Sequence, residues 1–339
     1  MPTILIDPLP RTLDLICDSM TRAKLESLGR LIIHEQGRMP DEMVDKYLPE
    51  VNIIMGQTKL PRERLQRAKN LKAIIDVEIN FTDAIDYDYC FANGIHVLTP
   101  ASAFADAVAE SALGMTIDLA RGITKADRDF RLGREAYGLD SNLRSFSLRG
   151  ASVGLIGYGY LARSFHKLIA PFHCEVSVYD PWVPDYLLEK AGCNSVRLNE
   201  LLSQCKVILV FAGVTSENQG FLGREELSLI RSDAIFLLMS RAAVVDFPVL
   251  LECVQHGKFR AATDVFPIEP VAKDDPVRNI DGLLLSAHRT GGMPEALFEI
   301  GRQAVADTEL ILKGLPPVVC RKALPETVKR FRSKPIDMT

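Results

Sequence analysis

The sequence predicts an α/β protein built from two doubly wound sheets of mainly parallel strands. At 339 residues the chain is too long for one ordinary hydrophobic core, so two domains are expected. Its strand candidates are short, continuous apolar runs, which are typical of strands buried on both faces. These runs alternate with helical patterns in two blocks, as parallel strands joined by crossover helices do.

The first hundred residues form one block. Its five strand candidates are Thr3–Asp7, Leu31–His34, Val51–Met55, Lys72–Asp76 and Ile95–Leu98. A long helix is predicted next, roughly from Ala105 to Arg121, because four apolar residues recur there at helical spacing: Val108, Ala112, Met115 and Leu119. Residues 122–150 are polar, contain turn-forming residues, and are predicted to be an extended surface segment.

The second block begins at Ser152. Its six strand candidates are Ser152–Ile156, Val176–Tyr179, Val207–Phe211, Ile235–Met239, Ala261–Val265 and Leu283–Ser286. Six such strands with right-handed crossovers describe a Rossmann domain. Another helix is predicted at about Glu295 to Leu312. The tail from Pro316 to Thr339 has too few apolar residues for a domain and is expected to pack on the first block.

Composition narrows the function classes. With 40 basic and 44 acidic residues the formal charge is −4, so the chain lacks the basic excess that holds a nucleic-acid backbone. No apolar run approaches the roughly 18 residues of a membrane span, and the N-terminus lacks the basic region of a secretory signal. The seven cysteines lack the spacing of a disulfide framework or a metal site. We therefore expect a cytoplasmic protein that binds neither nucleic acid, membrane nor metal.

A glycine-rich turn follows the first strand candidate of the second block. Gly157, Gly159 and Ala162 form a Gly-x-Gly-x-x-Ala pattern before a helix that starts near Tyr160. Such glycines allow a tight turn and let a pyrophosphate approach the backbone at a helix N-terminus. Asp180 ends the next strand, where an acidic group binds the adenine-ribose hydroxyls. Because its charge repels a 2′-phosphate, the pattern predicts NAD as cofactor and disfavours NADP.

Three polar side chains follow the last strands of this block. Arg241 comes after the fourth strand, Glu269 after the fifth and His288 after the sixth. Functional residues gather at the carboxyl ends of strands in open α/β sheets, so the three are expected to converge beside the nicotinamide. An arginine binds a carboxylate bidentately, and a histidine exchanges a proton near neutral pH. Singly, each also fits a surface or loop position; jointly, they favour a catalytic set.

These motifs resemble those of the D-isomer-specific 2-hydroxyacid dehydrogenases over roughly residues 40–318. The matching segments keep the family's order and spacing: Asp83–Asp86, Gly94–Val97, Ala107–Glu110, Leu148–Gly159, Tyr179–Pro181, Ser240–Asp246, Asp264–Pro270 and Ala287–His288. The resemblance implies two Rossmann-like domains, a dinucleotide-binding domain inserted into a flavodoxin-like substrate domain. The substrate domain would comprise residues 1–100 and 294–339, and the NAD-binding domain residues 101–293. The resemblance also implies a homodimer formed through the long helix after the first domain.

The resemblance implies hydride transfer between nicotinamide and C2 of a D-2-hydroxy acid or its 2-keto partner. In the catalytic set, His288 would exchange the proton of the C2 oxygen, Arg241 would bind the acid, and Glu269 would hydrogen-bond the histidine. The implied cofactor contacts are Gly157, Gly159, Tyr160, Leu161, Ala162, Asp180, Thr215, Met239, Ser240, Arg241, Asp264, His288 and Gly291. The implied substrate contacts are Val77, Glu78, Ile79, Arg241, His288 and Arg289.

The sequence departs from the family pattern in the substrate loop. Ile79 and Phe81 stand where the family has glycines, and a Cβ restricts positive φ, so we expect a loop of different shape. Glu78 adds a negative charge there. Two interpretations are equally open: its carboxylate contacts a substrate hydroxyl or amine, or it points away from the substrate. For Arg289, a second anionic group and solvent are both open as partners.

Two other functions fit the same residues. One is an NAD(H)-sensing binding module, similar to the transcriptional corepressors built on this fold, which the altered loop would suit. The other is a dehydrogenase of another small anion, such as phosphite. The complete catalytic set favours the hydroxyacid dehydrogenase over both.

Overall fold

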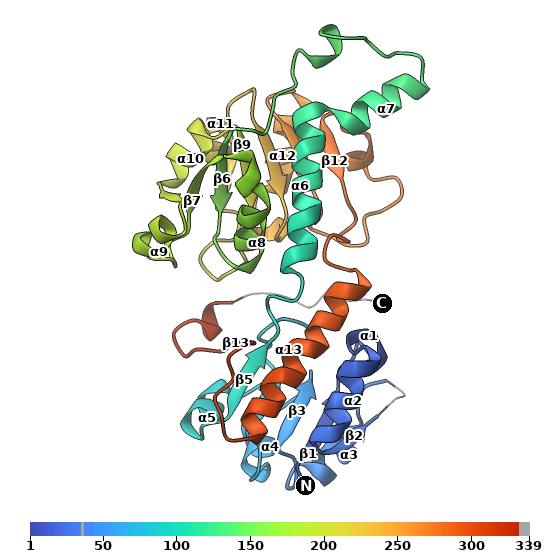
Figure 1. The fold of residues 1–339 in the computed structure, drawn as a ribbon, viewed down its shortest axis with the longest axis vertical. Coiled ribbons are helices and arrows are strands. Elements are labelled where there is room, and N and C mark those ends of the chain that lie inside the picture. The colour runs from blue at the N-terminus through green and yellow to red at the C-terminus, as the bar shows by residue number, and fades with distance from the viewer. Residues whose placement is uncertain (35–36, 332–339) are drawn as a thin grey trace. The chain divides into compact units, whose positions relative to one another are not determined.

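The computed structural model describes residues 1–34 and 37–331, and the chain divides into two compact units (Figure 1). Unit 1 comprises Met1–Phe104 and Gly292–Thr339, and unit 2 comprises Ala105–Gly291. Each unit has its own largely or wholly parallel sheet with helices on both faces. The predicted α/β class with two Rossmann-like domains is therefore confirmed. The sequence-based division into residues 1–100 with 294–339 and residues 101–293 differs from these units by a few residues at each boundary.

Unit 1 is built on a six-stranded sheet in the order β13-β5-β4-β3-β1-β2. Its strands are β1 Thr3–Asp7, β2 Arg30–Ile33, β3 Ile53–Gly56, β4 Ala73–Ile75, β5 His96–Thr99 and β13 Arg321–Lys322. The first five pair in parallel in the order of a flavodoxin-like sheet. β13 pairs antiparallel with β5, so this part of the C-terminal tail packs on the first block as predicted.

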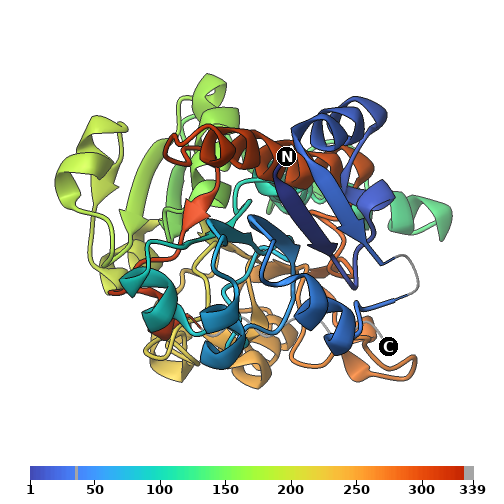
Figure 2. The same cartoon turned by 90° about the horizontal axis from the view of Figure 1, so that it is seen from below.

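Helices cover both faces of this sheet (Figure 2). They are α1 Leu13–Ile16, α2 Ser19–Leu28, α3 Asp41–Tyr47, α4 Arg62–Arg67, α5 Tyr87–Ala92 and α13 Pro294–Leu312. Alternate side chains of β1 point to opposite faces. Ile4 and Ile6 pack with residues of α1, α2 and α13, whereas Leu5 packs with residues of α3, α4 and α5. Burial on both faces explains why the apolar run of β1 is continuous.

Unit 2 is built on a seven-stranded sheet in the order β12-β11-β10-β9-β6-β7-β8, in which all neighbours pair in parallel. Its strands are β6 Ser152–Ile156, β7 Glu175–Tyr179, β8 Asn194–Ser195, β9 Val207–Val210, β10 Ile235–Leu238, β11 Arg260–Thr263 and β12 Leu283–Leu285. The strand order reverses between β6 and β9. Ligands of such sheets bind outside the carboxyl ends of the strands at this point.

Helices also cover both faces of the second sheet. They are α6 Ala105–Arg121, α7 Ile123–Arg131, α8 Tyr160–Ile169, α9 Asp185–Lys190, α10 Leu198–Gln204, α11 Arg224–Leu229 and α12 Phe247–Gln255. On one face α6 packs against α8, β10 and β11. The main core cluster includes residues of α10, α11 and α12. The long helix predicted from its apolar face is α6.

The segment 122–150 is not wholly extended, which corrects the sequence-based expectation. It begins with α7, after Gly122 in a left-handed conformation with a φ of 67°. None of the α7 residues is buried, so no core-facing apolar stripe marks the helix in the sequence. Ion pairs one turn apart, such as Arg131 with Asp127, stabilise it instead.

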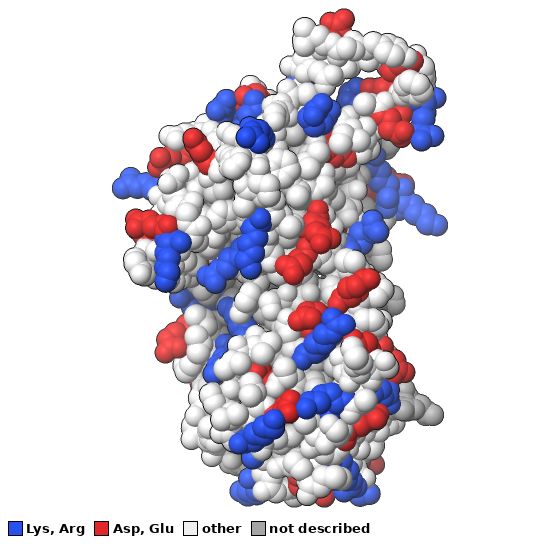
Figure 3. All heavy atoms as spheres, viewed as in Figure 1, with Lys and Arg blue, Asp and Glu red and all other residues white. Residues whose placement is uncertain are grey.

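The surface carries mixed charge. On the face shown in Figure 3, both basic and acidic side chains are scattered over the surface. All seven cysteines are free thiols. Among the described residues, no helix is both long and apolar enough to cross a membrane.

Candidate active site

The glycine-rich turn joins β6 to α8. Gly157 has a φ of 87°, and a Cβ there would lie 2.7 Å from the backbone of Ala212, so only glycine fits. Gly159 has a φ of −79°, and a Cβ there would meet no atom within 4 Å. The turn therefore leaves open space beside Gly159 at the N-terminus of α8, which no described side chain caps. Backbone N–H groups beside open space suit an anion such as a pyrophosphate.

Asp180 stands directly after β7 and beside this turn. Its Oδ2 accepts a hydrogen bond from Tyr158 N–H at 2.7 Å, and its Oδ1 accepts one from Trp182 N–H at 2.9 Å. Each carboxylate oxygen keeps a lone pair for a further donor. Since the residue is partly exposed, those lone pairs can accept from the vicinal hydroxyls of a ribose.

Several predicted cofactor residues lie at the carboxyl ends of neighbouring strands. Thr215 follows β9, and Met239 and Ser240 follow β10. Ser240 is 5% exposed, and its Oγ is buried with no hydrogen-bond partner among the described residues. A buried polar group without a partner costs about 1–3 kcal/mol, which a bound group would relieve. Together with the space beside Gly159, this hydroxyl fits a dinucleotide lying across these strand ends.

His288 and Glu269 form a close pair in the loops after β12 and β11. His288 Nδ1 lies 2.6 Å from Glu269 Oε2, and Glu269 Oε1 accepts a hydrogen bond from Phe266 N–H at 2.8 Å. Since a carboxylate only accepts, the Nδ1 proton points to Glu269 and Nε2 is left for another partner. The two side chains are 24% and 21% exposed. The pair is an oriented imidazole that can exchange a proton through Nε2.

Asp264 holds the segment that carries His288. It is 2% exposed and directly follows β11. Its Oδ1 accepts from Arg289 N–H at 3.1 Å, its Oδ2 from Thr290 Oγ1 at 2.5 Å, and its carbonyl from His288 N–H at 2.7 Å. His288 has a φ of 48°, in the left-handed region that most side chains avoid. Sequence reasoning missed Thr290, although its hydroxyl stands only two residues after the histidine.

Arg241 follows β10 at the same edge of the sheet. Its Nη1 donates to the carbonyl of Ser240 at 2.8 Å. Burial lowers the pKa of Arg241, whereas the nearby carboxylates of Glu269 and Asp264 raise it. A guanidinium stays protonated in either case. The structure thus brings a half-buried cation, two carboxylates and the imidazole of His288 to the carboxyl ends of these strands.

Other predicted site residues have fewer contacts. Tyr160 and Leu161 form the first turn of α8, where Tyr160 is exposed and Ala162 is fully buried. Arg289 is exposed and no described residue pairs with its guanidinium, so both alternatives for its partner stay open. Gly291 is the last residue of unit 2.

In unit 1 the loop after β4 has a residue with positive φ at position 79. The expectation that a side chain with a Cβ would exclude this conformation there was wrong. Ile79 has a φ of 68°, although a β-branched side chain disfavours that region. Asp76 holds the loop, because its Oδ1 accepts from Glu78 N–H at 2.9 Å and from Asn80 N–H at 3.3 Å. Burial raises the pKa of the Asp76 carboxyl to about 7.

Glu78 is half-buried near two arginines. Burial raises the pKa of its carboxyl, whereas Arg11 and Arg38 lower it. Arg11 Nε donates to the carbonyl of Val77 at 3.0 Å, and Arg38 Nη2 donates to the carbonyl of Gln57 at 2.9 Å. No described residue hydrogen-bonds the Glu78 carboxylate, so it can accept from an external donor.

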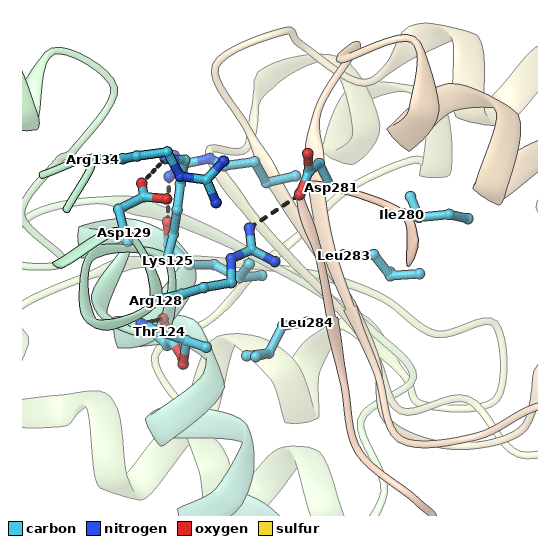
Figure 4. Close-up of a pocket in the computed structure, with 14 residues that line it drawn as sticks. Thr124, Lys125, Arg128, Asp129, Arg134, Ile280, Asp281, Leu283 and Leu284 are labelled. Atoms are coloured by element: carbon cyan, nitrogen blue, oxygen red, sulfur yellow. Dashed lines mark hydrogen bonds and ion pairs between the residues drawn. The ribbon is translucent and has the colours of Figure 1, made fainter. Parts of the chain in front are cut away.

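A separate cavity of about 640 Å³ opens at the opposite edge of the unit 2 sheet (Figure 4). It is lined by the end of α6, by α7 and by the starts of β11 and β12. Arg128 and Asp281 form an ion pair of 3.0 Å there, and Leu283 and Leu284 line its β12 side. The predicted catalytic residues follow the carboxyl ends of the strands, so this cavity is not their site.

A known family model matches unit 2. Residues 113–290, more than half of the chain, match the model described as "D-isomer specific 2-hydroxyacid dehydrogenase, NAD binding domain". The matched range includes the glycine-rich turn, Asp180, Arg241, Glu269 and His288. Unit 2, which contains these residues, therefore corresponds to the family's NAD-binding domain.

Similar proteins carry related names. The D-3-phosphoglycerate dehydrogenase of Archaeoglobus fulgidus is 30% identical over 274 residues, 80% of this chain and 51% of that protein. The hydroxypyruvate reductase of Blautia hydrogenotrophica is 25% identical over 304 residues, 88% of this chain and 94% of that protein. The crystal structure of a phosphoglycerate oxidoreductase from Rhizobium etli is 37% identical, with a TM-score of 0.89 over 97% of this chain and 100% of that one. The chain spans about half the length of the D-3-phosphoglycerate dehydrogenases it matches.

Proposed function

The chain belongs to the D-isomer specific 2-hydroxyacid dehydrogenase family, and we propose that it is an NAD-dependent oxidoreductase. The reaction moves a hydride between a nicotinamide and C2 of a D-2-hydroxy acid or its 2-keto partner, a small anionic substrate. The observation that carries this proposal is the His288–Glu269 pair, 2.6 Å apart and near Arg241. The names of the matched relatives support a substrate of this class.

The dinucleotide would be held by the glycine-rich turn and by the neighbouring strand ends. The turn residues would surround the pyrophosphate at the N-terminus of α8: Gly157, Gly159, Tyr160, Leu161 and Ala162. The further proposed contacts are Asp180, Thr215, Met239, Ser240, Arg241, Asp264, His288 and Gly291. When bound, the nicotinamide supplies or accepts the hydride.

His288 is the proposed general acid and base. On oxidation its Nε2 takes the proton of the C2 hydroxyl, and on reduction it donates a proton to the keto oxygen. Glu269 holds the ring in the tautomer that leaves Nε2 available, since it binds the Nδ1 proton. Arg241 binds the acid through its fork of N–H donors, which matches a carboxylate.

The substrate roles proposed for Val77, Glu78 and Ile79 in unit 1, and for Arg289 in unit 2, rest on the family pattern. The uncommitted carboxylate of Glu78 supports the reading in which it accepts from a substrate hydroxyl or amine. The exposed guanidinium of Arg289 would bind a second anionic group.

NAD is proposed over NADP because the Asp180 carboxylate, fixed beside the turn, would repel a 2′-phosphate. Purified protein is therefore given NADH or NADPH with glyoxylate, pyruvate, hydroxypyruvate and longer 2-keto acids, and consumption of the reduced cofactor is followed. We expect turnover of at least one acid with NADH and a kcat/KM at least about tenfold lower with NADPH, which corresponds to about 1.4 kcal/mol of repulsion. Tight NADH binding without turnover of any acid would contradict the enzyme and favour the NAD(H)-sensing module. Equal rates with NADPH would reject the cofactor preference.

A homodimer is proposed, with its contact on residues 122–147, which we call the arm. The family resemblance implies a contact through α6. The apolar face of this helix packs against α8, β10 and β11 of its own unit, which leaves little of that face for a partner. The arm instead exposes six large apolar side chains: Ile123, Phe130, Leu132, Tyr137, Leu139 and Leu143. Apolar groups gathered on one surface segment favour a protein partner, and a second copy presents the same segment.

Charged substitutions in the arm should separate the dimer. Light scattering is expected to give twice the chain mass for the wild type and the single chain mass for Leu139→Asp combined with Leu143→Asp. The matched control is Val318→Asp, which places a charge on an equally exposed apolar side chain of unit 1. A wild type that scatters as a monomer, or a double variant that stays dimeric, would rule out this contact.

A further inference from the structure

Tyr158, the residue between the two glycines of the turn, is fixed through each of its polar groups. Its N–H donates to Asp180 Oδ2 at 2.7 Å, and its carbonyl accepts from Arg163 Nε at 3.2 Å. Its hydroxyl lies 2.8 Å from His166 Nδ1. The residue is 5% exposed, although the middle position of such a turn needs no particular side chain.

The partners of Tyr158 come from three parts of unit 2. His166 and Arg163 lie on α8, and the Arg163 guanidinium carbon lies 5.5 Å from the centre of the tyrosine ring. Cys193, which follows α9, places its Sγ 3.4 Å from the same His166 nitrogen. Asp180 follows β7. The side chain thus connects the turn to the helix that it opens and to the neighbouring strand.

Burial keeps both members of the hydroxyl–imidazole bond uncharged. Burial raises the pKa of the Tyr158 phenol and lowers the pKa of His166. The phenol and the imidazole are therefore both uncharged near neutral pH, and one hydrogen bond joins the phenol oxygen to Nδ1, donated by whichever of the two carries the shared proton. Arg163 and Cys193 are the other titratable groups that face this pair.

The turn needs such a support. Gly157 and Gly159 flank Tyr158, and two glycines in a three-residue stretch lose more conformational freedom on ordering than other residues would. Gly159 has no protein neighbour near the position of a Cβ, so packing does not fix it from that side. A binding loop ordered before the ligand arrives does not lose that freedom on binding, which raises affinity.

We propose that Tyr158 and His166 are positioning residues that hold the glycine-rich turn in its binding shape and so set the affinity for the nicotinamide dinucleotide. The inference rests on the proposed use of this cofactor, but not on turnover of any acid. Neither residue touches the reacting atoms. Their effect is expected in the dissociation constant of NADH and not in kcat at saturating NADH.

The test removes each partner of this contact in turn and measures NADH binding by calorimetry. Tyr158→Phe lacks only the hydroxyl and is expected to weaken NADH binding about tenfold, as loss of one ordering hydrogen bond does. His166→Leu should weaken binding to the same extent. Combining the two changes should add little, because both remove one bond. His166→Asn, which places an amide that can donate or accept near the position of Nδ1, should restore most of the affinity.

The control is Tyr186→Phe, since Tyr186 is an exposed tyrosine on α9 of the same unit. It should bind NADH like the wild type. The proposal is overturned if Tyr158→Phe binds within about twofold of the wild type, if the two losses add in full, or if His166→Asn is as weak as His166→Leu. A wild type that binds NADH but turns over no acid would contradict the proposed reaction and leave this inference intact. A wild type that binds no NADH would refute the proposed cofactor, and with it this inference.

Discussion

Replacing His288 with asparagine is expected to lower kcat about 10³-fold while the dissociation constant of NADH changes little. Asparagine cannot exchange a proton near neutral pH, so the step assigned to Nε2 is lost. It is the least disruptive replacement, because His288 has a φ of 48° and asparagine tolerates this left-handed region well. The measurement is steady-state turnover of the best 2-keto acid, with NADH binding followed by calorimetry.

The matched control is His256→Asn, an exposed histidine at the end of α12 in the same unit. It should keep wild-type turnover. Glu269→Gln should lie between the two, since an amide still contacts Nδ1 but no longer favours the tautomer that leaves Nε2 available. Retained turnover in His288→Asn, or loss of NADH binding in that variant, would show that the histidine has another role.

Unit 1 is expected to lose stability as the pH rises, because of Asp76. The unfolded carboxyl has an ordinary pKa of 3.8, and burial raises the folded value to about 7. Between these values the folded state binds the proton and the unfolded state does not, so the free energy of unfolding falls with rising pH. Each pKa unit corresponds to about 1.4 kcal/mol, which makes the full loss about 4 kcal/mol at most.

Denaturant unfolding at about pH 5 and about pH 8 measures this effect. Asp76→Asn mimics the protonated acid, so it should remove much of the pH dependence and be more stable than the wild type at the higher pH. Asp83→Asn, which changes an exposed carboxylate of the same segment, should leave the dependence unchanged. A wild type whose stability is equal at both values, or an Asp76→Asn variant that keeps the full slope, would contradict the assignment.

Strands were predictable where both faces are buried. β1 and β6 have the predicted bounds, and most of their residues have almost no contact with solvent. β8 and β13 were not predicted, because each is two residues long and mostly exposed, so its sequence carries no apolar run. Such strands form only once a neighbouring strand offers an edge. α7 was not predicted for a related reason: ion pairs stabilise it, and it has no buried apolar face that the sequence could reveal.

The candidate site was predictable as far as topology determines it. Arg241, Glu269 and His288 could be named because residues after parallel strands share one edge of the sheet. The contacts of Thr290 and His166 depend on how a loop and a helix side chain meet their neighbours, which spacing alone does not reveal. The expectation that positive φ requires glycine was wrong at Ile79. The loop keeps a left-handed conformation there, at a cost of about 1 kcal/mol or more.

The short strand β13 has a consequence for self-association. Its residues Arg321 and Lys322 pair with Thr99 and Leu98, so β5 is not the outermost strand of the unit 1 sheet (Figure 1). An uncovered β5 would offer unpaired N–H and C=O groups, a template for strands of other molecules. A two-residue outer strand with basic side chains is a poor template. The tail thereby makes the β5 side of this sheet a poor site for edge-to-edge aggregation.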